Sequence, residues 1–189
     1  MTTLNKILET DARLSQQLRL PEKAWTGWHS IGSLLAHSGD SWYLLPALGL
    51  VWLFANCTWH NRAALMGMGL IFLAAEVLIL KFIIRRRRPP GEWGEIYRST
   101  DPHSFPSGHA ARVTYLAVMA IGLGPAWLAV LLLVWAPLVG LARIAMGVHY
   151  LSDVIAGALL GILWAVIMLA LQGFIVRIFS VLPFIFCTL

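Results

Sequence analysis

Long apolar runs dominate this chain, and they restrict it to folds that a lipid bilayer can surround. Of the 189 residues, 59% are hydrophobic and only 12% are charged, and the mean hydropathy is +0.75. A soluble domain needs a larger polar shell than this composition provides. Apolar runs of about 20 residues indicate helices that cross a membrane. We therefore expect an all-α, polytopic transmembrane helix bundle that forms one integral-membrane domain, residues 1–189.

The apolar runs predict about five spans, preceded by helices that do not cross the membrane. Residues 1–38 are predicted to form an amphipathic interfacial helix over 1–23 and a short lead-in helix over 25–38. The transmembrane core, residues 42–176, contains runs at about 42–57, 63–84, 109–124, 127–141 and 154–176. Residues 177–189 form an apolar tail that we expect at the interface. Connections 58–62 and 123–126 share one side of the membrane, and 85–109 and 142–153 share the other.

Cysteines and net charge add two further expectations. Cys57 and Cys187 are far apart and have no ligand-like spacing, so we expect two membrane-embedded thiols rather than a disulfide or a metal site. The net charge is +5, and the basic residues cluster at predicted membrane borders. This placement favours anionic lipid or phosphate as the partner and argues against nucleic acid. The N-terminus lacks the pattern of a cleavable signal, so we expect the first span to direct insertion.

The first polar cluster is KFIIRRRRPP, residues 81–90. Lys81 and Arg88 are seven residues apart, which predicts that they share one helix face about 10 Å apart along its axis. Pro89 and Pro90 are expected to stop that helix. A basic run of this kind also serves as an anchor on lipid headgroups. Lys81, however, lies a turn inside the span, where a cation needs a partner or a function.

The second cluster is SFPSGHAAR, residues 104–112, at the start of a span. Ser107 is a favourable N-cap, and Gly108 allows a ligand to approach the backbone. The free N–H groups of the first turn then form an anion site, and His109 lies in that turn. The alternative is a capped helix with an interfacial histidine. A zinc site using His103 and His109 is disfavoured, because no third ligand with suitable spacing is evident.

The third cluster is ARIAMGVHYLSDVIAG, residues 142–157. His149 and Asp153 are four residues apart, so on a helix they share a face. The carboxylate then accepts a hydrogen bond from one ring nitrogen and leaves the other nitrogen free to attack. Arg143 lies upstream, across Gly147, as a further cation. The alternative is a structural His–Asp pair at the start of a span.

All three clusters lie on the same predicted side of the membrane, and together they suit a dianionic phosphate, a nucleophile and an acid. The patterns Lys-x6-Arg-Pro, Pro-Ser-Gly-His and Arg-x5-His-x3-Asp resemble those of the type-2 phosphatidic acid phosphatase superfamily, in the membrane lipid phosphate phosphatase branch. Matching positions span about residues 81–153: Lys81, Arg88, Pro89, Pro106, Ser107, Gly108, His109, Arg143, His149 and Asp153. The family usually has Ser-Arg where this chain has Ala142-Arg143, and its membrane members often have six spans rather than five.

The resemblance implies hydrolysis of a lipid phosphomonoester or diphosphate without a metal or other cofactor. His149 would attack phosphorus to form a phosphohistidine, with Asp153 orienting it and His109 as acid and then base. The phosphate ligands would be Lys81, Arg88, Ser107, Gly108 and Arg143. The substrate class includes undecaprenyl diphosphate, phosphatidylglycerophosphate and phosphatidic acid. A lipid phosphotransferase that passes the phosphoryl group to an alcohol is the main alternative; a vanadium haloperoxidase and a non-enzymatic lipid-binding or transport protein are the others. The identity of the lipid and the oligomeric state are left open.

For a bacterial protein of this class we expect the inner (plasma) membrane. Two arguments about which side of that membrane the site faces disagree. Of the 14 lysines and arginines, 12 lie on or near the side of the three clusters, and only Arg62 and Arg177 lie near the other. Setting aside Lys81, Arg88 and Arg143 leaves nine against two (12 − 3 = 9). The positive-inside rule then places the site and the N-terminus in the cytoplasm. Many bacterial members of the family act on the periplasmic face, so the resemblance favours the opposite orientation.

Overall fold

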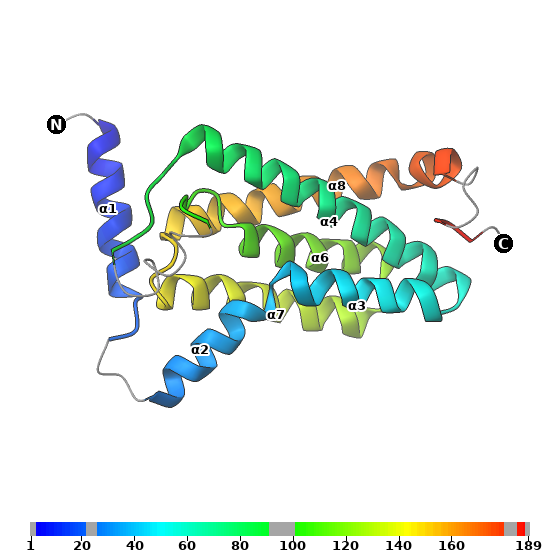
Figure 1. The fold of residues 1–189 in the computed structure, drawn as a ribbon, viewed down its shortest axis with the longest axis horizontal. Coiled ribbons are helices and arrows are strands. Elements are labelled where there is room, and N and C mark those ends of the chain that lie inside the picture. Colours follow the sequence, from blue (N-terminus) through cyan, green and yellow to red (C-terminus); the bar gives the residue numbers. More distant parts are fainter. Residues whose placement is uncertain (1–2, 22–25, 91–100, 180–184, 188–189) are drawn as a thin grey trace.

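The computed structural model describes residues 3–21, 26–90, 101–179 and 185–187, and within them the chain folds into seven helices. Their bounds are α1 Thr3–Gln17, α2 Thr26–Ser38, α3 Ser41–Phe54, α4 Cys57–Ile84, α6 Gly108–Leu123, α7 Ala126–Ala145 and α8 Leu151–Phe179. Figure 1 shows α3, α4, α6, α7 and α8 running along a common long axis, with α1 across one end. The all-α bundle predicted from the sequence is therefore confirmed.

Three helices of the described residues, α4, α7 and α8, are long and apolar enough to cross a membrane. They correspond to the predicted second, fourth and fifth spans. The other two core helices are shorter, because α3 contains 14 residues and α6 contains 16. The predicted count of five spans is thus not confirmed. Large apolar side chains such as Leu78 on α4, Val134 on α7 and Leu163 on α8 are more than half exposed, as expected for surfaces that face lipid.

The start of α4 differs from the prediction, which placed a connection at 58–62. Asn56 is the N-cap, and its side chain accepts a hydrogen bond from the N–H of Trp59 at 3.1 Å. This cap lets the helix begin at Cys57, so only residues 55–56 separate α3 from α4. On the far side of the bundle, α7 also extends beyond its predicted end, to Ala145, and the connection to α8 shortens to 146–150.

Backbone contact between α6 and α8 forms the centre of the bundle. A Cβ atom added to Gly157 would lie 2.3 Å from the carbonyl oxygen of Ser107, and one added to Gly161 would lie 2.3 Å from that of Ala111. Small residues at these positions allow two helices to approach closely in a membrane. This contact also brings the start of α6 against α8, where the N–H of Ser107 donates to the carbonyl of Asp153 at 2.9 Å.

A disulfide closes the opposite end of the bundle and corrects the prediction of two free thiols. Cys57 and Cys187 are bonded, with their Cα atoms 5.4 Å apart. Asn61 holds the same tail residue: its side chain donates to the carbonyl of Cys187 at 3.0 Å and accepts from its N–H at 2.8 Å. The pairing was missed because residues 185–187 return to the start of α4 across a sequence separation of 130 residues. This described part of the tail packs against the bundle, and Phe186 is buried.

Helix α1 covers the other end of the bundle. Ile7, Leu8 and Leu14 remain exposed along it, which agrees with the predicted amphipathic stripe. Its inner face caps α8, since the N–H of Leu151 donates to Ser15 Oγ at 2.8 Å and the N–H of Ser152 donates to the carboxylate of Asp11 at 3.0 Å. The ends of the predicted 1–23 helix, and the start of the predicted lead-in helix, lie outside the described residues.

Candidate active site

All three predicted clusters lie at the end of the bundle that α1 covers (Figure 1). There the C-terminal end of α4 meets the N-terminal end of α6, the last turn of α7 and the start of α8. Among the site residues that the sequence predicts, Lys81, Arg88, His109, Arg143 and His149 are each at most 8% exposed. Charged and polar side chains buried to this degree need partners or a function.

The start of α6 has the geometry predicted from its sequence. Ser107 is the N-cap, and its hydroxyl accepts from the N–H of Ala110 at 3.4 Å. The first residue of the helix, Gly108, is buried below α4, where an added Cβ would lie 3.3 Å from Val77. First-turn N–H groups without intrahelical partners attract anions. The helix start therefore presents N–H groups of the kind that can bind an anion.

The prediction that Lys81 and Arg88 share a helix face is wrong, although both reach the site. Helix α4 ends at Ile84, and Arg85 is its C-cap with a left-handed φ of 52°. The chain then becomes extended, so Arg88 comes from a loop segment rather than from the helix. Both cations nevertheless bind the same atom: Lys81 Nζ pairs with Asp101 Oδ2, and Arg88 Nη2 lies 2.8 Å from it. Two cations thus converge on one anionic oxygen.

His149 and Asp153 also come together differently from the prediction. Helix α8 begins at Leu151, so His149 precedes it and does not share a helix face with Asp153. The imidazole Nδ1 lies 3.6 Å from Asp153 Oδ2, too far for a hydrogen bond but within reach of a small movement. Its other nitrogen, Nε2, lies 3.3 Å from Nη1 of Arg88. The ring is thus set between the carboxylate of Asp153 near one nitrogen and the guanidinium of Arg88 near the other.

Asp153 is fixed by groups other than His149. Its Oδ1 accepts from Nη1 of Arg86 at 2.7 Å, and its Oδ2 accepts from the N–H of Tyr150 at 2.8 Å. The same guanidinium binds Asp11 of α1 at 2.6 Å through Nη2. Arg86 therefore links the interfacial helix to the carboxylate beside His149. From the sequence alone, Arg86 was expected only to add positive charge near the site.

His109 has a carboxylate partner that was not predicted from the sequence. Its Nε2 pairs with Oδ1 of Asp40, a residue of the short connection between α2 and α3. Asp40 follows the lead-in segment and directly precedes an apolar run. A lone acidic residue at a membrane border was the only sequence signal for its role.

Arg143 connects the two histidines electrostatically. It lies in the last turn of α7 and is 1% exposed. Its positive charge acts on both His109 and His149, which places all three groups around one centre. Downstream, Gly147 adopts a φ of 67°, a conformation that glycine tolerates well, and the chain turns there toward His149.

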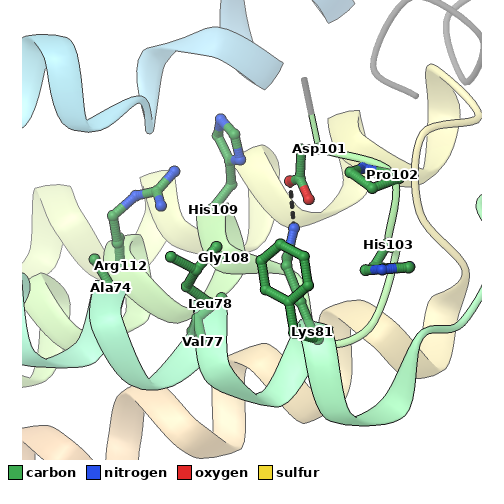
Figure 2. A pocket seen from close by; sticks show the side chains of 11 residues that line it. Ala74, Val77, Leu78, Lys81, Asp101, Pro102, His103, Gly108, His109 and Arg112 are labelled. Atoms are coloured by element: carbon green, nitrogen blue, oxygen red, sulfur yellow. Dashed lines mark hydrogen bonds and ion pairs between the residues drawn. The ribbon is translucent and has the colours of Figure 1, made fainter. Parts of the chain in front are cut away.

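His149 lines a cavity of about 150 Å³, whereas another cavity, of about 270 Å³, opens beside Lys81 and His109 (Figure 2). One part of its lining is polar and includes Lys81, His109 and Arg112. The other part is apolar and comes from α4, with Leu78 and Phe82 among its residues. Figure 2 shows Lys81 pointing across the cavity to Asp101 while His109 stands on the neighbouring helix. The cavity can therefore take a polar head and an apolar chain at once.

Burial lowers the pKa of His149 well below its ordinary value of 6.5, and the nearby charges of Arg143, Arg88 and Lys81 lower it further. The imidazole is consequently neutral near pH 7, the form in which it can act as a nucleophile. Within the described residues, no group of three or more His, Cys, Asp or Glu side chains could hold a metal ion. The weak zinc interpretation of His103 and His109 gains no support from this arrangement.

Comparisons with known proteins identify the family of this chain. The sequence pattern of the PAP2 superfamily matches residues 62–177. An undecaprenyl-diphosphatase of Sulfolobus acidocaldarius is 33% identical over 135 residues, 67% of this chain and 62% of that protein, so the chain spans just under two thirds of this relative. The phosphatidylglycerophosphatase B of Bacillus subtilis is 28% identical over 172 residues, 84% of this chain and 81% of that protein.

Solved structures give the same result. The crystal structure of a transmembrane PAP2-type phosphatidylglycerolphosphate phosphatase from Bacillus subtilis superposes with a TM-score of 0.72 at 26% identity, covering 92% of this chain and 88% of that one. The LpxE structure from Aquifex aeolicus shares the fold, with a TM-score of 0.67. The relatives named as phosphatases support a hydrolase that acts on phosphoric ester bonds. With its pattern matched over most of its length and its three motif clusters gathered at one end of a helical bundle, the chain belongs to the PAP2 superfamily.

Proposed function

We propose that the protein is a membrane lipid phosphatase that hydrolyses a lipid phosphomonoester or diphosphate through a phosphohistidine intermediate. The observation that carries this proposal is the setting of His149. Its ring is buried and neutral, with one nitrogen beside Asp153 and the other 3.3 Å from Arg88. A neutral imidazole that faces a phosphate-binding cation is suited to attack phosphorus.

The proposed reaction has two steps. In the first, Nε2 of His149 bonds to phosphorus, the bond from phosphorus to the leaving oxygen breaks, and that oxygen takes a proton from His109. In the second, water gives a proton to His109 and attacks phosphorus, the N–P bond breaks, and phosphate leaves. Lys81, Arg88 and Arg143 neutralise the oxyanions in both steps, together with the start of α6.

A lipid substrate is supported by the two-sided lining of the cavity. Its apolar side comes from α4, whose Leu78 and Phe82 are also about half exposed on the outer surface of the bundle. A headgroup can therefore reach Lys81 while its chain stays along α4. The relatives act, by their names, on undecaprenyl diphosphate, a decaprenylphosphoryl sugar phosphate and phosphatidylglycerophosphate. We assign the substrate to this class of lipids.

The preferred headgroup is strongly anionic. A second cavity, of about 460 Å³, is lined by Arg85, Arg87, Arg88 and His103. Because Arg88 faces both this cavity and the site of phosphoryl transfer, a second phosphate of a diphosphate headgroup fits there. A monophosphate lipid would leave this second cavity without a phosphate.

The test is phosphate release by the purified protein in detergent, with undecaprenyl diphosphate, phosphatidylglycerophosphate and phosphatidic acid as separate substrates and no alcohol acceptor. We expect release from at least one of them and a loss of about 10⁴-fold or more for His149→Ala. Vanadate, which mimics five-coordinate phosphorus, should inhibit. Glu9→Gln, a change on the exposed part of α1, is the matched control and should not alter the rate. A His149→Ala protein with near-normal turnover would refute the proposed nucleophile.

We also propose that the site faces the cytoplasm. The excess of basic residues lies at the site end, and the Cys57–Cys187 disulfide closes the opposite end. Disulfides form and persist in oxidising compartments such as the periplasm and are rare in the cytosol. The charge distribution and the disulfide therefore favour the same orientation by independent physical reasons.

Alkaline phosphatase fused after Leu189 tests this orientation, because the reporter folds only in the periplasm. We expect an active fusion. In intact cells, Cys57 and Cys187 should also resist alkylation until a reductant is added. An inactive fusion, with both thiols alkylated without reductant, would reverse the orientation and leave the proposed chemistry untouched.

A further inference from the structure

The protein contains a second histidine–carboxylate pair, and we propose that Asp40 is the positioning residue for His109 in the acid–base step. This inference rests on the proposed function. Nε2 of His109 pairs with Oδ1 of Asp40, and the His109 side chain is 11% exposed. The Asp40 side chain is 25% exposed, so the pair is partly shielded from water, and a charged hydrogen bond there is stronger than at a fully exposed surface.

Asp40 lies at a helix N-cap, but its side chain does not bond to that helix. It is the N-cap of α3, where an aspartate normally accepts hydrogen bonds from the first turn. Its side chain makes no such bond. Instead Oδ1 pairs with His109 and Oδ2 lies 3.1 Å from Nδ1 of His37. Both carboxylate oxygens of Asp40 thus contact imidazole rings instead of accepting hydrogen bonds from the first turn of α3.

The connection that carries Asp40 is held firmly against the core. The Nε–H of Arg112 donates to the carbonyl of Gly39 at 3.1 Å, and the indole N–H of Trp135 donates to Ser38 Oγ at 2.9 Å. Gly39 packs so closely on α6 that an added Cβ would lie 2.9 Å from Val113. Because α6 also carries His109, the same helix fixes both members of the pair.

Charged groups from several helices surround the His109–Asp40 pair. Burial raises the pKa of Asp40, but hydrogen bonds and charge from His109 and His37 outweigh it and lower that pKa to about 2. Asp40 is therefore an anion throughout the working pH range. Three cations also face His109: Arg112 on α6, Arg143 on α7 and Lys81 on α4. Asp101 is the one other carboxylate beside it among the described residues. Asp40 is thus the main counter-charge for an imidazolium at His109.

This geometry assigns the two ring nitrogens of His109. A proton on Nε2 is held by Asp40, so Nδ1 is the atom that exchanges a proton with the substrate. As the bond between phosphorus and the leaving oxygen breaks, the Nδ1 proton passes to that oxygen and His109 becomes neutral. When water attacks the phosphohistidine, its proton returns to Nδ1. Asp40 stays ionised in both steps and keeps the ring in the productive tautomer.

Leaving-group dependence tests the inference with Asp40→Asn, which keeps the shape of the side chain and remains a good N-cap. With dioctanoyl phosphatidic acid, whose alkoxide must be protonated as it leaves, we expect turnover to fall about 10²-fold. With p-nitrophenyl phosphate, whose leaving group needs no proton, we expect the pre-steady-state burst of p-nitrophenolate, which reports the first step alone, to change by about threefold or less. The alkaline limb of the kcat/KM profile for the lipid should move to lower pH, since the imidazolium has lost its carboxylate.

His109→Ala should reproduce the same leaving-group pattern, and Glu9→Gln should leave both rates unchanged. A loss that is equal for the two substrates would make Asp40 merely structural and overturn the inference. So would an Asp40→Asn protein with wild-type rates. If the wild-type protein released phosphate from p-nitrophenyl phosphate and from all three lipid phosphates named above at no measurable rate, the proposed function would fail and the inference with it.

Discussion

The two ends of the helical bundle are held together by different chemistry. At the site end, charged side chains join segments that are distant in sequence: Arg86, just after α4, binds Asp11 of α1 and Asp153 of α8. At the opposite end, one disulfide and a few hydrogen bonds fasten the tail to the start of α4. The site end therefore combines stability with function, whereas the opposite end contributes stability alone.

Because of this difference, removing a charge at the site end should lower both the stability of the fold and the turnover. Deleting one member of a buried ion pair leaves its partner without compensation, which is more destabilising than losing an exposed pair. The same partner groups orient the proposed catalytic residues. Variants at the two ends should therefore separate into those that lose stability and turnover together and those that lose stability only.

The largest effect is expected for Arg86→Leu. Its loss leaves Asp153, which is fully buried, and Asp11 without their shared cation. We expect a free energy of unfolding lower by about 3 kcal/mol, and turnover lower by about 10²-fold because Asp153 no longer orients His149. Thermal unfolding in detergent and phosphate release measure the two quantities. Arg13→Leu, an exposed position on α1, is the control. Wild-type stability in Arg86→Leu would remove the contrast between the two ends.

A smaller effect is expected at the disulfide end. Replacing Cys57 and Cys187 by serine removes the cross-link but no site residue. We expect the free energy of unfolding to fall by about 2 kcal/mol, with kcat and KM within about twofold of wild type because no contact of the site changes. The same two assays apply, and dithiothreitol should produce the same shift in the wild-type protein. A parallel loss of turnover would mean that the two ends are coupled through the helices.

The smallest effect is expected from pH. Burial lowers the pKa of His149 below 6.5, so at pH values just under 6.5 the unfolded chain takes up a proton that the folded protein does not. Stability is therefore lost as pH falls below 6.5, by at most about 1.4 kcal/mol per pH unit. His149→Gln should show a shallower decline of the unfolding temperature between pH 7.5 and 5. Identical slopes would indicate that His149 is charged when folded.

The sequence predicted the composition of the site better than its geometry. Lys81, His109 and His149 were identified from motif spacing, because the chemistry restricts the residue types and the family motifs supply their order. Spacing alone also suggested one helix face for Lys81 and Arg88, and the left-handed Arg85 shows why this failed. Helix ends depend on tertiary contacts that a helical repeat does not contain.

The residues that the sequence analysis missed share a physical reason. Asp40 and Asp101 belong to connections, and their partners lie 69 and 20 residues away. Cys57 and Cys187 are 130 residues apart. Apolar periodicity locates helices, but it says nothing about which loops meet at the ends of a bundle. Those pairings became visible only once the helices were arranged in space.

The glycines of α8 have a consequence for how the protein responds to its surroundings. Because Gly157 and Gly161 seat α8 directly on the backbone of α6, no side chain at these two positions separates the helix that follows His149 from the first turns of α6, which carry His109. A bilayer that thickens or thins can tilt the outer helices without stretching this junction. We therefore expect the distance between the two imidazoles, which this main-chain contact helps to set, to depend little on the thickness of the surrounding bilayer.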